Sequence, residues 1–358
     1  MNLGTLLGVR RCPATRDGSA RRDPARSLAV LPAAYAVPGG AARRERGGVL
    51  GVLLGAGLLA VACASCSINR MATNAVANAI ANGPDVYSTD DDPELVRDAV
   101  PFGLKTMESL LEVVPRHRGL LLAACRGYTQ YAYAFVQLDA DLLGPEDYDR
   151  AVAMRGRAER LYLRARDFGL RALEIDYRGI GQELRLAPER AAARVRAKDV
   201  PHLYWTAAAW GSAISLGKDQ PALVADLGAV MALVRRALEL DESFDGGSLH
   251  EAMIVLEALP PAMGGSAARA REHYRRAVEL SRGGKAGPYV TLAQSVSVMT
   301  QDRAEFRRLL HKALEVDPDR DPRQRLATIV LQRWARSLLA REDELFLEPD
   351  TLENGSEP

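Results

Sequence analysis

Histidine and cysteine are scarce in this chain, with five and four copies among 358 residues. The cysteines, at positions 12, 63, 66 and 125, are too few and too unevenly spaced for a disulfide framework or a four-thiolate zinc site. The histidines occur singly, and none lies three or four residues from a cysteine or from another histidine. The sequence therefore predicts no metal site and no bound cofactor.

Signatures of catalysis are missing as well. The chain contains no glycine-rich phosphate-binding loop and no Gly-x-Ser-x-Gly elbow. The pair His250-Glu251 lacks the second histidine that a zinc-protease helix requires. We therefore expect that this protein is not an enzyme.

The chain also has no strong excess of either charge, since 47 basic and 46 acidic residues give a formal net charge of +1. The first 62 residues hold nine arginines and three acidic residues. The remainder carries 38 basic and 43 acidic residues, a net charge of −5. A mildly acidic chain of this kind is a poor partner for nucleic acid, so we expect no nucleic-acid binding.

No apolar run reaches the roughly 20 residues that a membrane-spanning helix needs. A shorter run, residues 49–62, contains only Val, Leu, Gly and Ala and follows three closely spaced arginines. This pattern is typical of a secretory signal, although an uncleaved short anchor helix is a second interpretation. Small residues precede a cysteine at its end, as in the lipobox of bacterial lipoproteins, whose cysteine receives a diacylglyceryl group.

Two cysteines fit that pattern, and we favour Cys66 over Cys63 because the polar stretch 67–70 then opens the mature chain. Acyl chains on this cysteine would hold the protein on a membrane. Neither cysteine is followed by Asp, which favours the outer membrane over the inner. Residues 1–65 are thus a leader, and its first forty residues suggest a disordered extension from a start codon assigned too far upstream.

Apolar residues spaced by three and four dominate from Ser67 onward, and β-branched runs are few, which predicts helices without a sheet. We expect a first helix over 69–81. A second helix should begin after Asp92, with Asp92 as N-cap and Pro93 at the first helical position.

A recurring tail is the most informative pattern in the chain. It occurs as RALEID at 171–176, RALELD at 236–241, RAVELS at 276–281 and KALEVDP at 312–318. The alanines at 237, 277 and 313 are spaced by 40 and 36 residues, close to the roughly 34-residue tetratricopeptide period. Alanine at this position allows close approach of a neighbouring helix, and an insertion at 179–200 accounts for the longer step before the second copy.

Each tail closes the second helix of a predicted helical hairpin. The expected pairs are 118–138 with 148–176, 202–216 with 220–241, 249–259 with 266–281, and 288–299 with 303–316, followed by a capping helix at 322–341. Each hairpin leaves an apolar face bare, so the hairpins should stack as one all-α, tetratricopeptide-like solenoid. This predicts a single domain over 66–342, followed by a disordered acidic tail at 343–358.

Aromatic residues make up only 6% of the chain, yet they concentrate in two of the predicted first helices. The candidates for lining a ligand channel are Tyr128, Tyr131, Tyr204, Trp205 and Trp210. Aromatic rings with a few polar tips suit an organic ligand, and packing in the solenoid core is the competing interpretation. Cys125 lies on an apolar side of its helix, and we expect it to be a small buried hydrophobe.

Several longer stretches together carry a family resemblance. They are SINRMATNAVANAI, STDDDPELVRDAVPFGLKTMESLLEVVPRHRGLLLAACRGYTQYAYAFV, GGSLHEAMIVLEALP, GGSAARAREHYRRAVELS and GPYVTLAQSVSVMTQDRAEFRRLLHKALEVDP. Taken as a set, from about residue 66 to 341, they resemble the TRAP transporter TatT component family. These are tetratricopeptide-like lipoproteins associated with tripartite ATP-independent periplasmic transporters.

The resemblance implies an all-α protein that assembles as a homotrimer, with a pore through each protomer. It also implies a periplasm-facing, lipid-anchored accessory component that binds the periplasmic solute-binding protein of a TRAP system and passes on a small organic ligand. It supports Cys66 as the acylated residue and offers no catalytic residue to transfer. The alternative is a generic tetratricopeptide-like lipoprotein scaffold of a cell-envelope complex.

Overall fold

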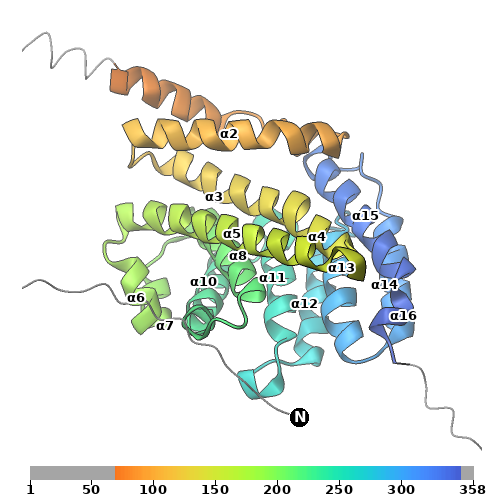
Figure 1. The fold of residues 1–358 in the computed structure, drawn as a ribbon. Coiled ribbons are helices and arrows are strands. Elements are labelled where there is room, and N and C mark those ends of the chain that lie inside the picture. The colour runs from red at the N-terminus through yellow and green to blue at the C-terminus, as the bar shows by residue number, and fades with distance from the viewer. Residues whose placement is uncertain (1–68, 348–358) are drawn as a thin grey trace, which may run out of the picture. The chain divides into compact units, whose positions relative to one another are not determined.

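A computed structural model describes residues 69–347, all of which fall within one compact unit. These residues form helices joined by short turns, and no strand occurs among them (Figure 1). The all-α prediction is therefore confirmed, while the tetratricopeptide-like detail of the hairpins remains a prediction. The leader, with Cys63 and Cys66, lies outside the described residues. No described helix has both the length and the apolar character needed to cross a membrane.

The helices follow the predicted order closely. A helix over 69–82 is followed by α2 (Pro93–Val113), α3 (Arg118–Ala132), α4 (Leu138–Leu142), α5 (Tyr148–Asp176), α6 (Ile180–Leu186), α7 (Pro188–Ala193) and α8 (Val200–Leu216). The second half contains α9 (Pro221–Val224), α10 (Leu227–Leu240), α11 (Ser248–Glu257), α12 (Ala267–Leu280), α13 (Gly287–Leu292), α14 (Arg303–Leu314), α15 (Arg325–Ala340) and α16 (Glu342–Leu345). Two π-helical turns, η1 (Tyr133–Gln137) and η6 (Ala293–Ser297), interrupt helices that the periodicity predicts as regular.

Local sequence explains where several helices begin. The Asp92 side chain accepts hydrogen bonds from the backbone N–H groups of Glu94 and Leu95, both at 3.0 Å, and Pro93 occupies the first helical position of α2. Ser266 caps α12 in the same way by accepting from the backbone N–H of Arg269 at 3.3 Å. The predicted N-cap at Asp92 is confirmed, because its carboxylate satisfies N–H groups that the first turn leaves free.

The alanine of every recurring tail is fully buried. Ala172, Ala237, Ala277 and Ala313 each have 0% exposed surface. At Ala277 the neighbouring backbone comes so close that a Cβ added to Gly247 would lie 3.0 Å from the Ala277 Cα. The small side chain therefore sets the distance between adjacent helices, as the sequence predicts.

The prediction of one helix over 220–241 is wrong, because a turn at Ala225–Asp226 separates α9 from α10. The Asp226 N–H donates to the Leu223 carbonyl at 3.1 Å, a tighter bond than an α-helix makes. The Asp226 carboxylate accepts from Arg185 Nε at 3.3 Å. Arg185 belongs to α6, so a contact from the inserted segment holds the turn in place.

At the C-terminal end, packing continues past the boundary predicted at residue 342. The short helix α16 ends before Phe346, which is buried against Phe306 with 5.1 Å between the ring centroids. The first residues of the predicted acidic tail thus belong to the packed unit.

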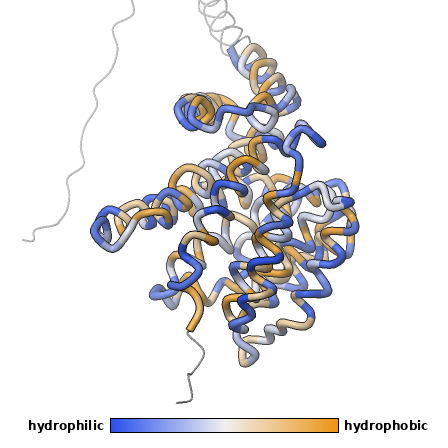
Figure 2. The backbone as a smooth tube through the Cα atoms, turned by 90° about the vertical axis from the view of Figure 1, so that its right-hand side faces the viewer, coloured by the Kyte–Doolittle hydropathy of each residue, from blue (hydrophilic) through white to orange (hydrophobic). Residues whose placement is uncertain are grey.

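The core consists of two hydrophobic clusters. One is built mainly on α2 to α10 and the other mainly on α13 to α15, and Tyr133, Ala134 and Leu326 pack against both. Figure 2 shows hydrophobic and hydrophilic positions alternating along the helices, as expected where one side of each helix faces a neighbour.

The last long helix of the array contacts the second one. Helix α15 packs against α2, and Figure 1 shows α15 beside the segment that leads into α2. The backbone N–H of Leu326 donates to the Ser88 carbonyl at 3.1 Å, and Arg333 Nη2 donates to Glu94 Oε2 at 3.1 Å. These pairs join residues more than 230 positions apart in the sequence.

A second set of contacts ties the same helix to the middle of the chain. Arg341 Nη1 donates to the Asp141 carbonyl at 2.8 Å, and the Trp334 indole donates to Gln294 Oε1 at 2.8 Å. Helix α15 therefore links the start of α2, the residues after α3 and the π-helical turn η6. Through it the array of hairpins closes on itself.

Replacement of a tail alanine tests the role of close helix approach. We expect Ala277→Leu to lower the free energy of unfolding by about 1–3 kcal/mol, because the larger side chain has no space. Ala268→Leu, at an exposed position of the same helix, should change it by less than about 0.5 kcal/mol. Urea denaturation measures both, and equal stability of the two variants would contradict the packing argument.

Candidate functional site

The five aromatic residues predicted to line a channel lie on two helices, α3 and α8, but they do not form one site. Trp210 is fully buried in the core, with 0% exposed surface. The Arg166 and Arg185 guanidinium carbons lie 5.4 and 5.5 Å from the centroid of its ring. Trp210 therefore offers no ring surface to a ligand in this conformation.

Tyr128 and Tyr131 are buried on α3. The Tyr128 hydroxyl donates to Glu108 Oε1 at 2.8 Å, and its ring stacks on Phe168 with centroids 5.9 Å apart. Burial raises the pKa of Tyr128 to about 12. The Tyr131 ring packs against the Phe135 ring, with 5.9 Å between the centroids. These two rings belong to the packing between α3 and the helices beside it.

Tyr204 and Trp205 keep part of their surface accessible on α8. Their rings meet edge to face with centroids 5.0 Å apart, and Tyr204 also contacts Phe244 at 5.3 Å. Of the five predicted residues, these two retain the most room for a ligand.

The structure brings Glu251, which the sequence did not single out as a site, near both Tyr133 and Tyr204. Tyr133 lies in the π-helical turn η1, at the junction of the two core clusters. Glu251 lies on α11. Its carboxylate is close enough to Tyr133 and Tyr204 to raise the pKa of each phenol, in addition to the larger effect of burial.

The Glu251 carboxyl lies against α13. Thr291 Oγ1 on α13 donates to Glu251 Oε1 at 3.1 Å. The backbone of Gly287 comes very close, because a Cβ added there would lie 2.4 Å from Oε1 and 2.5 Å from Oε2. Burial raises the pKa of Glu251 above its usual value of 4.5, and the nearby charge of Lys285 and the Thr291 hydrogen bond offset this only in part.

Two polar atoms in this region have no partner within residues 69–347. The Tyr133 hydroxyl and Glu251 Oε2 make no hydrogen bond there, yet neither atom is closed off from a water-sized probe. Both side chains lie deep in the fold and still keep part of their surface accessible. Water can therefore reach both groups, and water or a ligand can satisfy them.

Sequence reasoning could reach only part of this region. Tyr133 directly follows α3, within the helix that the sequence predicts over 118–138, so the clustering of aromatic residues indicated this segment. Glu251 carried no signal, because its neighbours in the sequence are those of an ordinary helix and its partners Thr291 and Gly287 lie about 40 positions away.

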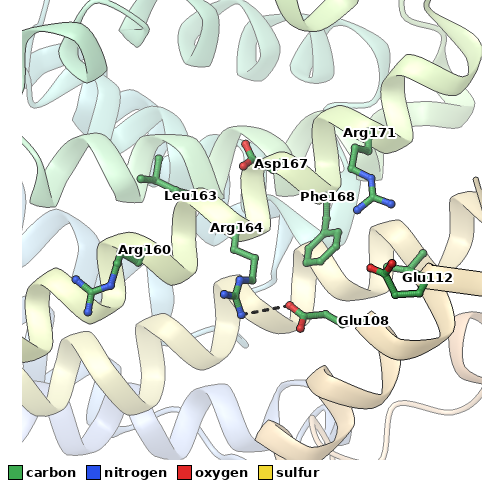
Figure 3. Close-up of a pocket in the computed structure, with 9 residues that line it drawn as sticks. Glu108, Glu112, Arg160, Leu163, Arg164, Asp167, Phe168 and Arg171 are labelled. Carbon is green, nitrogen blue, oxygen red and sulfur yellow. Dashed lines mark ion pairs between the residues drawn. The ribbon is translucent and has the colours of Figure 1, made fainter. Parts of the chain in front are cut away.

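A groove of 540 Å³ lies between α2 and α5 (Figure 3). Three arginines of α5, Arg160, Arg164 and Arg171, line it together with Phe168, and Figure 3 shows Glu108 and Glu112 on the α2 side. The remaining lining residues are Leu111, Leu163 and Asp167.

The groove combines three arginines and three carboxylates with the apolar side chains of Leu111, Leu163 and Phe168. Arg164 Nη1 lies 3.2 Å from Glu108 Oε1, and the Arg171 guanidinium carbon lies 5.5 Å from the Phe168 ring centroid. Arg160 is exposed and forms no ion pair with any residue that the structure describes. Arginine and aromatic side chains of this kind dominate many protein–protein interfaces.

Two histidines that are far apart in the sequence meet in the structure. His250 Nδ1 lies 2.8 Å from His273 Nδ1, and His250 Nε2 lies 3.0 Å from Glu242 Oε1. Arg276 also binds Glu242. Within the described part of the chain, no group of three or more metal-ligating side chains is brought together. This cluster therefore joins α11 to α12.

Comparison with known proteins identifies the family. A family model described as the TRAP transporter T-component matches residues 89–346, most of the chain. The chain belongs to the TRAP transporter T-component family. The T-component also resembles a protein of Treponema pallidum (strain Nichols), described as "Uncharacterized protein", with 29% identity over 305 residues that cover 80% of this chain and 94% of the relative.

Family membership confirms the resemblance recognised in the sequence. A T-component is an accessory protein of TRAP transport in the cell envelope and belongs to no enzyme family, as expected from the missing catalytic signatures.

The raised pKa of Glu251 predicts how stability depends on pH. In the unfolded chain this carboxyl loses its proton near 4.5, whereas the folded T-component keeps it to higher pH. The folded state thus binds more protons over that range, and its stability falls as pH rises through it. The free energy of unfolding of Glu251→Gln, relative to the wild type, should increase as the pH rises above about 4.5.

Urea denaturation at several pH values measures this difference. Glu272→Gln, which removes an exposed carboxylate on α12, is the matched control and should show no such rise. A constant difference between Glu251→Gln and the wild type across the range would show that Glu251 titrates as it does in water.

Proposed function

We propose that this T-component is a lipid-anchored, periplasm-facing accessory protein that binds the solute-binding protein of a TRAP system and takes a small organic ligand into its interior. The observation that supports the ligand part is the accessible surface of Tyr133 and Glu251, two side chains that lie deep in the fold. Aromatic surface from Tyr204 and Trp205 supports an organic ligand there. Passage of the ligand through the protomer is part of this proposal.

The groove between α2 and α5 is the proposed contact for the solute-binding protein. Its arginines can pair with carboxylates on the partner, and the Phe168 ring beside Arg171 supplies apolar contact. Because Arg160 has no ion pair among the described residues, it can accept such a partner without breaking an existing contact.

We further propose a homotrimer. Two large apolar side chains on α2, Leu95 and Phe102, are 59% and 80% exposed. Their exposure supports a contact between copies of the chain, since apolar surface of this kind is usually covered in an assembly.

The anchor is proposed at Cys66, with Cys63 as the alternative, in the outer membrane. Native mass spectrometry of the membrane-extracted protein should show an assembly of three chains. Peptide mass spectrometry of the same sample should show that the first peptide begins at an acylated Cys66. Cys66→Ser should release the protein into the soluble fraction, because the acyl chains supply the membrane affinity. A single chain would contradict the trimer. Membrane retention of the Cys66→Ser variant, together with release of the Cys63→Ser variant from the membrane, would contradict acylation at Cys66.

Affinity purification from the native membrane tests the partner. We expect the full chain to recover a periplasmic solute-binding protein. The double variant Arg160→Glu, Arg171→Glu should recover about tenfold less, because it places like charges against the partner's carboxylates. Raising the salt concentration should weaken the wild-type complex for the same reason.

The exposed Arg336 on α15 supplies the control, since Arg336→Glu makes one charge reversal away from the groove. Equal recovery with the groove variant and with Arg336→Glu would remove the groove from the interface. Recovery of outer-membrane assembly proteins in place of a solute-binding protein would favour the alternative function, a generic scaffold of an envelope complex.

A further inference from the structure

We propose that Glu251 makes the interior site selective for an organic cation, a small molecule that carries an ammonium group beside an apolar body. This inference rests on the proposed function, since it names the ligand class of the same interior space. It starts from the arrangement of Glu251, Tyr133 and Tyr204, which come from three separate segments, α11, η1 and α8.

The first argument is the free oxygen of Glu251. Thr291 binds Oε1, and Oε2 is left accessible without a hydrogen bond from any described residue. A carboxylate inside a protein is stable when a cation or several donors pair with it. Burial favours the protonated carboxyl, and an ammonium group bound at the accessible Oε2 would stabilise its charged form.

The second argument is that the basic side chains around this site already have partners. Lys285 Nζ lies 2.8 Å from Asp245 Oδ2 and 2.9 Å from Ser248 Oγ. Arg155 Nε lies 2.9 Å from Asp141 Oδ1. Because Asp245 and Asp141 are already paired with these basic residues, Glu251 is the acidic group that we expect a ligand to contact.

The third argument is the sign of the surrounding charge. Besides burial, the groups that raise the pKa of Tyr133 are the carboxylates Glu251 and Asp141, and those that raise the pKa of Tyr204 are Glu251 and Asp245. These carboxyl groups therefore lie close to the phenol rings. Phenol rings also attract ammonium groups through their π faces, whereas a ligand carboxylate would be repelled by Glu251.

Three probes of similar size test this assignment: 2-phenylethylammonium, its neutral counterpart 2-phenylethanol, and 3-phenylpropionate. Isothermal titration calorimetry with the full chain should show that the ammonium probe binds more tightly than the other two. Glu251→Gln should weaken the ammonium probe by about tenfold or more, the effect of losing one charged hydrogen bond, and should leave the alcohol nearly unchanged.

Two further variants separate the effect of the Glu251 charge from that of an exposed carboxylate and from that of aromatic surface. Glu272→Gln, at an exposed position, should bind all three probes as the wild type does. Tyr133→Leu should weaken all three probes, because it removes ring surface that the site offers to any aromatic ligand. Melting temperatures of each variant show that it folds.

The outcomes distinguish the ligand class from the site itself. Tighter binding of 3-phenylpropionate, or no effect of Glu251→Gln on the ammonium probe, would overturn the cation assignment while leaving an interior ligand site. Failure of all three probes to bind would overturn both the assignment and the proposed interior site.

Discussion

The contact between α15 and the start of α2 is the constraint on which the interior depends. Hairpins in a stack contact mainly their neighbours, so the first and last hairpins of an open stack each leave an apolar face uncovered. Here the Leu326 backbone bonds to Ser88, and Arg341 reaches the Asp141 carbonyl. Helix α15 therefore covers part of α2, while Leu95 and Phe102 of α2 stay exposed. The exposed Arg333–Glu94 pair adds little to stability, because surface ion pairs contribute about 0–1 kcal/mol.

Polar groups lie beside the junction of the two core clusters. Two π-helical turns face this region: η1 carries Tyr133, and η6 carries Gln294, which accepts from Trp334. Such turns insert one residue into a helix and redirect its side chains, and they are frequent at functional sites. A fully packed core would have placed an apolar side chain where Glu251 lies. The polar junction is the place where we propose that a ligand binds.

Periodicity and local chemistry predicted much of this fold. The Asp92 cap depends on adjacent residues, and the buried alanines of the tails repeat in the sequence, so both could be found without a structure. The break between α9 and α10 could not, because it depends on Arg185, about 40 residues away from Asp226. The same limit applies to the site. Aromatic clustering led to α3 and α8, but only the fold brings Glu251 to Tyr133.

A high-resolution crystal structure of the full chain tests the central claim most directly, because it shows whether space remains where the closed array is expected to leave it. We predict ordered water or a bound molecule within hydrogen-bond distance of the Tyr133 hydroxyl and of Glu251 Oε2, with α15 seated on α2. Direct packing of these two side chains against protein, with no intervening density, or α15 detached from α2, would contradict the claim.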